Sequence, residues 1–160
     1  MELQQAEVLA QLSSNDPRKQ VAGLMLLRRD SVANPASLAP LAPFLVQRFV
    51  VPRVVRRLPA SRGVKYAVRD RNVTPLIDPE FNLRIRVLSM RFGGTNADLL
   101  PCMDVSVSLI ATATEINTWQ STIAHCTVVN GSATTNELDN FYEEMADLIY
   151  ERVDGYFETR

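Results

Sequence analysis

The chain has 160 residues, of which 46% are hydrophobic and 22% are charged, and its formal net charge is −1. This length and composition are typical of one soluble globular domain. They exclude a membrane-spanning helix, because no apolar run reaches the roughly 18 residues that a span needs. We therefore predict a single domain over residues 1–160, with a helical or mixed N-terminal segment at 1–35 and an α/β core at 36–160.

The N-terminal stretch MELQQAEVLAQLSSND has an acidic residue at position 2 and lacks the apolar centre of a secretory signal. On this pattern we expect a cytoplasmic or virion-borne protein. If a leader is removed before this numbering, the expected location is the periplasm or the outer membrane.

Positive and negative charges occupy separate parts of the chain. Residues 47–91 contain eleven Lys or Arg and three acids, whereas residues 137–160 contain eight acids and two Arg. Such segregation indicates an anionic partner, or contact between the two segments within one molecule or between copies.

The first elements in chain order are helical. Residues 2–13 keep rough helical spacing of Leu and Ala, and Asp16 with Pro17 is typical of a helix start. The apolar run VAGLMLL at 21–27 fits either a helix or a short buried strand, and its period does not decide between them. Three prolines then predict a connector over residues 30–43.

Residues 44–58 are predicted to form a helix disturbed at Pro52, which a loop at 59–63 ends. Residues 64–69 form a short strand candidate. Residues 82–92 alternate as a strand, but the apolar positions change parity after Val87. A β-bulge near Leu88 and Ser89 would produce this change.

Residues 103–129 are predicted to form an antiparallel hairpin with one wet face and a turn at 112–117. If the turn centres near Thr114, paired residue numbers sum to about 228, so that Cys102 lies opposite Cys126. A cross-strand disulfide is then conceivable in an oxidising setting. The alternative, which we favour, is two reduced cysteines that act as small hydrophobes.

A long helix is predicted after the capping box formed by Thr134 and Glu137. Apolar residues recur every three or four positions from 138 to 157, which is typical of a helix lying on a sheet. We expect this helix to cover the hairpin, with Trp119 anchoring the hairpin against a helix. The opposite face of the helix is acidic.

No catalytic constellation can be assembled from these residues. His125 is the only histidine, and it has no nucleophile at a motif spacing, while Cys126 points to the opposite face of the strand. Gly93 and Gly94 follow a strand but are not followed by the Lys-Ser/Thr pair of a phosphate loop. We therefore predict that the protein is not an enzyme and has no catalytic, metal or cofactor site.

The basic stretch is the strongest candidate for function. Arg53, Arg56 and Arg57 lie on one helical face, and Arg84 and Arg86 lie on one strand face. These arginines could follow phosphates of a nucleic acid, an interpretation that we do not favour because the whole chain is not basic and its aromatic residues form no RNA-binding motif. They could also meet the acidic helix of another copy, or pair within the molecule. The acidic members of the candidate interaction surface are Glu143, Glu144, Asp147 and Glu151.

The stretches GVKYAVRDRNVTPLIDPEFNLRIRVLSMR and MDVSVSLIATATEINTWQSTI resemble a family of bacterial envelope accessory proteins. This family includes the curli-secretion lipoprotein, penicillin-binding-protein activator lipoproteins and transporter-associated auxiliary lipoproteins. Thr114 and Trp119 match the family's hairpin turn, whereas the Asp and Gly of that turn are absent here. The resemblance implies that 21–27 is the first strand. It also implies a two-layer α/β domain that binds partners or forms rings, without catalytic residues.

We thus predict an α+β fold, a two-layer sandwich with a mainly antiparallel sheet of four or five strands and two long helices on one face. The predicted core consists of Leu83, Ile85, Val105, Val107, Leu109, Ile123, Phe141, Met145, Leu148 and Ile149. The predicted function is a non-enzymatic assembly or accessory subunit of a larger complex, with protein partners that include further copies of the chain. A bacteriophage neck or tail ring protein is the first alternative, and a nucleic-acid-binding module is the second.

Overall fold

The computed structural model describes residues 3–34, 41–62, 66–68, 81–93, 98–130 and 137–158. The helices are α1 (Leu3–Leu12), α2 (Pro17–Ala33), α3 (Ala42–Leu45), the π-helix η2 (Val46–Val50), α4 (Val51–Arg62) and α5 (Glu137–Glu158). The strands are β1 (Tyr66–Val68), β2 (Phe81–Gly93), β3 (Asp98–Ala111), β4 (Asn117–Cys126) and β5 (Val129–Asn130).

The body of the sheet consists of the three long antiparallel strands β2, β3 and β4. The strand order is β1-β2-β3-β4, with three-residue β1 parallel to β2 and two-residue β5 paired with β3. The register of β2 shifts between Val87 and Ser89, which confirms the predicted bulge. Pairs such as Val105 with Ile123 and Cys102 with Cys126 confirm the predicted hairpin register.

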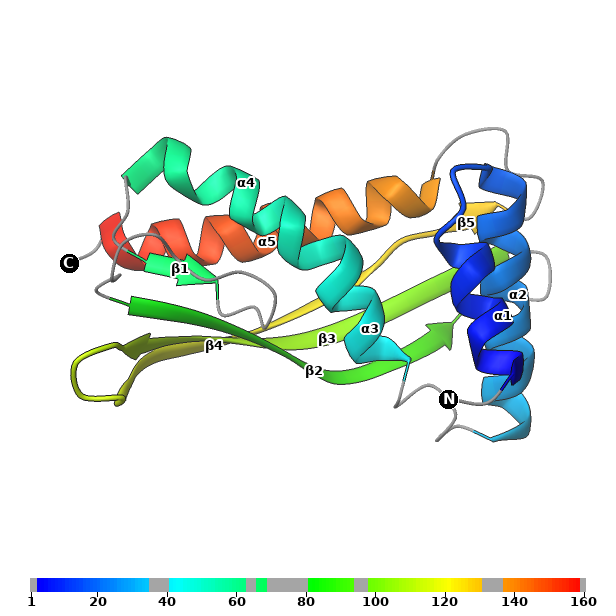
Figure 1. The fold of residues 1–160 in the computed structure, drawn as a ribbon, viewed down its shortest axis with the longest axis horizontal. Helices are drawn as coiled ribbons and strands as arrows, with labels where there is room; N and C mark the ends of the chain where they lie inside the picture. Colours follow the sequence, from blue (N-terminus) through cyan, green and yellow to red (C-terminus); the bar gives the residue numbers. More distant parts are fainter. Residues whose placement is uncertain are drawn as a thin grey trace.

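The helices cover one face of this sheet (Figure 1). The continuous helical segment α3–η2–α4 and helix α5 lie side by side over that face, whereas α1 and α2 stand together at one end of the sheet. The predicted α+β class is confirmed. The finer prediction of four or five strands and two long helices is not confirmed. Three long antiparallel strands form the body of the sheet, and α1 and α2 form a helical pair that the predicted sandwich did not include.

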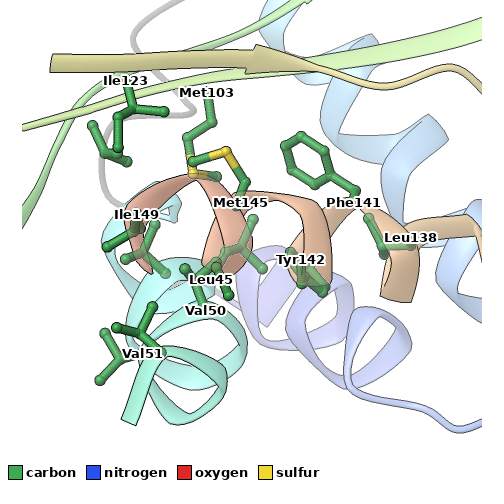
Figure 2. Packing of buried hydrophobic residues seen from close by; sticks show 14 of the residues in the cluster. Leu45, Val50, Val51, Met103, Ile123, Leu138, Phe141, Tyr142, Met145 and Ile149 are labelled. Carbon is green, nitrogen blue, oxygen red and sulfur yellow. The ribbon is translucent and has the colours of Figure 1, made fainter. Parts of the chain in front are cut away.

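The core lies between the sheet and the helices (Figure 2). Alternate residues of β3, from Met103 to Leu109, point into it and are fully buried, and α5 contributes Phe141, Met145 and Ile149. Of the predicted core residues, Ile85 and Leu148 are only partly buried, and the other eight are buried.

The run at 21–27 lies within α2, so the strand that the family resemblance implied is wrong. Asp16 caps this helix by accepting a hydrogen bond from the backbone N–H of Arg18 at 3.0 Å, and Pro17 is the first helical residue. Gly23 explains the close approach of α1, because a Cβ at this position would lie 3.0 Å from Leu12 Cγ. Local capping and packing against α1 thus select the helix, where the spacing of the apolar residues fitted both a helix and a strand.

Two predicted boundaries are also shifted. Helix α2 extends to Ala33, into the predicted connector, and α4 extends to Arg62, through the predicted loop. The helix predicted at 44–58 is present, and its π-helical turn ends at Val50, two residues before Pro52. The residues between 131 and 136, with the predicted capping position Thr134, lie outside the described residues.

Cys102 and Cys126 form a disulfide across β3 and β4, and the expectation of two reduced cysteines is therefore wrong. The antiparallel register places them directly opposite each other, with their Cα atoms 4.1 Å apart. Trp119 anchors the hairpin as predicted, because its ring stacks on Tyr156 of α5 at 5.5 Å between centroids.

Candidate interaction surfaces

Helices α4 and α5 are joined by a row of ion pairs, which we call the helix seam: Arg53 and Arg57 with Asp139, Glu143 and Asp147. Arg53 Nε donates to Glu143 at 2.8 Å, and Arg57 Nε donates to Asp147 at 2.8 Å. The other nitrogens of the same guanidinium groups bind Asp139 and Glu143. Each arginine thus bridges two carboxylates of the facing helix.

The sequence spacing produces this row. The two arginines are four residues apart on α4, and the three acids are four residues apart on α5, so both sets form straight rows on their helices. Arg53 and Arg57 also donate to backbone carbonyl groups one turn earlier in their own helical segment, those of Phe49 and Arg53. These bonds hold the two guanidinium groups in position for α5.

Burial strengthens the seam at its inner end. The Arg53 side chain is 15% exposed, and its guanidinium lies 5.6 Å from the centroid of the Tyr142 ring. Tyr142 stacks in turn on Phe49, and burial raises the pKa of its hydroxyl. By contrast Arg56 is 68% exposed and reaches Glu143 only at 3.5 Å, so it lies at the margin.

The seam changes the acidity of Glu143. The hydrogen bond from Arg57 is the largest influence that lowers the pKa of this carboxyl group, and Arg53 acts in the same direction against partial desolvation. Glu143 is therefore held in its charged form between two arginines.

A second polar cluster ties β4 to α5. His125 Nε2 lies 2.5 Å from Glu144 Oε2, and the Thr127 hydroxyl donates to the same oxygen at 2.7 Å. The imidazole also stacks on Phe141. The Thr127 bond, followed by His125, lowers the pKa of Glu144 against partial desolvation.

This cluster differs in geometry from a hydrolytic triad. In a triad the carboxylate and the nucleophile contact different imidazole nitrogens, so that the imidazole can take the hydroxyl proton. Here Glu144 and the Thr127 hydroxyl both contact Nε2 of His125, and the hydroxyl proton points to Glu144. The arrangement is suited to holding the hairpin against α5.

A small cavity of about 200 Å³ lies beside the seam. Its walls are the turn between α1 and α2, from Leu12 to Asn15 with Gln20, and the seam side chains Arg53 and Asp139 with the rings of Phe49 and Tyr142. Arg53 and Asp139 bind each other, so the charged wall of the cavity is already neutralised within the protein.

The face of the sheet that points away from the helices carries a different arrangement. We call it the open sheet face, and it consists of Arg84, Arg86, Ser106, Ser108, Gln120 and Thr122. The two serines of the central strand are buried, at 5% and 6% exposure, whereas the other four side chains are exposed. Arg84 lies opposite Ser108 and then Gln120, and Arg86 lies opposite Ser106 and then Thr122. Both arginines are exposed, and no carboxylate of the described residues is paired with them.

The next charged residues on this face form an ion pair with each other. Arg91 donates to Asp104 at 2.8 Å, and the Ser89 hydroxyl donates to the same oxygen at 2.7 Å. The disulfide between Cys102 and Cys126 follows on the same face. Among the described residues, Arg84 and Arg86 are therefore the positive charges of this surface without a carboxylate partner.

The structure separates the predicted interaction residues into groups. It brings Arg53, Arg56 and Arg57 together with Glu143 and Asp147 in one molecule, and it places Glu144 with His125. Glu151 is exposed on α5. Sequence reasoning missed Asp139, although its position four residues before Glu143 was a usable signal.

Among the described residues, no group of three or more histidine, cysteine or acidic side chains is arranged to hold a metal ion. No helix in the described ranges is long and apolar enough to cross a membrane.

No family model and no curated protein matches this chain. Among solved structures, a Caulobacter crescentus protein described as a lipoprotein has 15% identity over 56% of this chain and 74% of its own length, with a TM-score of 0.45. A Xanthomonas campestris protein of the DUF330 family has 16% identity over 62% of this chain and 54% of its own, with a TM-score of 0.41. A lipoprotein from Neisseria meningitidis has 12% identity over 78% and 83%, with a TM-score of 0.31. The resemblance to bacterial lipoproteins is confirmed as a similarity, and it assigns no residue a role.

Proposed function

We propose that this protein is a non-enzymatic accessory subunit that acts through contact with another protein. The observation that carries the proposal is the open sheet face. Helices cover the other face, while this one exposes Arg84 and Arg86 without a carboxylate partner among the described residues. An exposed pair of like charges at fixed spacing favours a partner of opposite charge.

The ion pairs of the helix seam bear on which surface of the protein binds a partner. Contact between copies through α4 and α5 would have to open the ion pairs of Arg53 and Arg57, each of which already binds two carboxylates. Breaking such pairs costs free energy that a new contact must offset. We therefore propose the open sheet face, in preference to the seam, as the surface for a partner.

The same reasoning makes nucleic acid a poorer partner. A phosphate-binding surface needs several unpaired cations, and the arginines of α4 that would join Arg84 and Arg86 are largely neutralised by α5. The ring-forming phage protein remains the alternative in which further copies of the chain supply the contact.

The disulfide supports an oxidising compartment as the place of action. Disulfides persist in secreted, periplasmic and cell-surface proteins and are rare in the cytosol. Cys102 and Cys126 are bonded here, so we propose that the protein works in the cell envelope. Thiol titration of the denatured protein, isolated without reductant, tests this point: free thiols at two per chain would contradict it.

The decisive experiment combines a measurement of the molecular mass in solution with capture of partner proteins. Purified protein is measured by light scattering behind a sizing column at low and high salt, and is then used to capture proteins from an envelope extract of its source. We expect one protein partner at fixed stoichiometry, with weaker capture at high salt. A monomer that captures no protein at either salt contradicts the accessory role. A closed multimer at low salt without any other partner supports the ring alternative.

A further inference from the structure

The cavity beside the helix seam is built entirely from residues of the described ranges. It lies where the turn between α1 and α2 meets α5 and the helical segment that carries Phe49 and Arg53. Asn15 lines it and is exposed, and the Asp139 side chain in the same wall is partly exposed. The cavity therefore reaches the surface, where a small molecule can enter it.

The Tyr142 hydroxyl is a buried polar group in the wall of this cavity. Tyr142 is 3% exposed and lies on the side of α5 away from the sheet, where its ring stacks on Phe49 (Figure 2). Its hydroxyl oxygen is buried and has no hydrogen-bond partner among the described residues. Burial raises the pKa of this hydroxyl, so it keeps its proton and can donate. A buried donor without a partner costs free energy, and a ligand that supplies an acceptor removes this cost.

The turn between α1 and α2 adds groups of both kinds to the same wall. The Ser13 hydroxyl donates to the Leu9 carbonyl at 2.6 Å, which leaves its oxygen able to accept. Ser14 Oγ accepts from the backbone N–H of Asp16 at 3.1 Å, which leaves its proton able to donate. Gln20 Nε2 donates one proton to the Ser14 carbonyl at 2.6 Å and carries a second. The cavity thus offers both donors and acceptors to a ligand.

The charges in the wall favour a neutral ligand. Arg53 binds Asp139 within the wall and Glu143 beside it. A charged group that entered the cavity would lose water without gaining a counter-charge, unless it broke one of these ion pairs. A neutral group with hydroxyl or amide chemistry meets no such cost.

The size of the cavity limits the ligand to about one ring. A cavity of about 150 Å³ in another protein holds benzene. The volume here is about 200 Å³, which admits a six-membered ring with polar substituents.

We propose that this cavity binds one neutral pyranose sugar. The hydroxyl groups of such a ring both donate and accept hydrogen bonds, which matches the wall. Tyr142 donates to a sugar oxygen, and the side chains of the turn bind further hydroxyl groups. The site lies on the helical side of the molecule, so this inference does not depend on the partner surface proposed above.

Sugar titrations followed by ¹H–¹⁵N NMR test the proposal. The probes are glucose and N-acetylglucosamine, and the matched charged controls are glucuronate and glucosamine. We expect a neutral sugar to bind with a Kd of about 1 mM or lower, which the size of such a ligand allows. The charged sugars should bind at least about ten-fold more weakly, because the charges of the wall are already paired. Equal binding of neutral and charged sugars, or binding of no neutral sugar, overturns the inference.

The same spectra locate the bound sugar. The side-chain amide signals of Asn15 and Gln20 should move during the titration. Those of Asn117 and Gln120, which bind each other on the hairpin, are the control and should stay in place. Shifts confined to the hairpin overturn the assignment to the cavity.

Removal of one hydroxyl group completes the test. Tyr142→Phe should weaken glucose binding about ten-fold, as the loss of one buried hydrogen bond would. Without sugar, its unfolding midpoint should be unchanged or higher, because the lost hydroxyl has no partner among the described residues. Tyr150→Phe on the same helix, away from the cavity wall, is the matched control and should bind glucose normally. Full affinity of folded Tyr142→Phe overturns the inference. If that variant does not fold, Asn15→Ala replaces it, and full affinity there overturns the inference.

A disaccharide separates the two sources of such a ring. If cellobiose binds at least as tightly as glucose, the cavity accepts the end of a sugar chain. If cellobiose binds about ten-fold more weakly, the cavity accepts a free sugar. Both results support the cavity as a sugar site.

Discussion

The helix seam and the open sheet face both carry arginines at regular spacing, but their environments are opposite. On α4, Arg53 and Arg57 meet a row of acids on α5 and bind two carboxylates each. On β2, Arg84 and Arg86 meet Ser108 and Ser106 across the strand pair and stay exposed. The neighbouring element therefore determines whether an arginine forms ion pairs within the protein or is available to bind a partner.

This difference separates stability from recognition. Changes at the seam and in the core beneath it should alter the free energy of unfolding. Changes at Arg84 and Arg86 should alter binding and leave the fold intact.

The largest effect should come from Phe141→Ala, on the side of α5 that faces the sheet. Phe141 is 1% exposed and stacks on His125 of β4, so its loss leaves a cavity between the two layers. We expect a loss of about 3–5 kcal/mol in the free energy of unfolding, measured by urea denaturation. The matched control is Leu148→Ala on the same helix. Because Leu148 is only partly buried, about 1–2 kcal/mol is expected there. Equal losses in the two variants would contradict the layer arrangement.

Removal of the disulfide should have the next largest effect. Cys102 and Cys126 are 24 residues apart in the sequence, and closing a loop of this size stabilises a fold by about 2–4 kcal/mol. We expect Cys102→Ala/Cys126→Ala to lose stability in this range while helix α5 stays packed, as judged by the near-ultraviolet signal of Trp119. Reductant should destabilise the unmodified protein and leave the double variant unchanged. If reductant destabilised both the unmodified protein and the double variant, it would be acting at a site other than this disulfide.

Much of the fold was predictable because its signals are local. Alternation identified β2, β3 and β4, the bulge followed from a change in parity near Leu88, and the hairpin register followed from the position of the turn. The helical stripe identified α5, although the segment that carries its predicted cap lies outside the described residues. These features depend on residues close in sequence.

The unpredicted features depend on contacts distant in sequence. Residues 21–27 are apolar in a pattern that two structures share, and packing of Gly23 against Leu12 selects the helix. It was equally open whether the basic and acidic helices pair within one molecule or between copies. Arg53 and Glu143 are 90 residues apart, and their spacing does not decide this. The disulfide required both the register and the oxidation state, and sequence supplies only the register.

At the seam, Arg53→Ala should be clearly more costly than Arg56→Ala. Arg53 is 15% exposed, binds two carboxylates and lies over the Tyr142 ring, so about 1–2 kcal/mol of stability should be lost. Arg56 is 68% exposed, and its loss should cost less than about 0.5 kcal/mol. Urea denaturation at neutral pH measures both. Similar costs would mean that the seam is no more than a row of solvated charges.

The cluster on β4 should give a smaller effect that depends on pH. The bond from Thr127 lowers the pKa of Glu144 in the folded protein, so folding favours the charged carboxylate. This contribution is present above about pH 4.3, the ordinary pKa of glutamate, and is lost as the pH falls toward the folded-state value. Thr127→Val should therefore lose under about 1 kcal/mol at pH 7, since Glu144 is 47% exposed, and less at pH 3.5. An equal loss at both pH values would mean that Thr127 acts through packing alone.

The smallest effect on stability should come from Arg84→Gln/Arg86→Gln, which removes both open charges and keeps polar side chains at these positions. Both arginines are exposed and bind no carboxylate of the described ranges, and substitutions at such surface positions change stability by less than about 0.5 kcal/mol, so the unfolding curve should match that of the unmodified protein. Arg91→Gln is the useful contrast on the same strand, because Arg91 binds Asp104 and should show a small loss. A loss above about 1 kcal/mol in the double variant would make Arg84 and Arg86 structural, and the distinction between seam and open sheet face would fail. Unchanged stability combined with lost capture of a partner would separate recognition from folding on this strand.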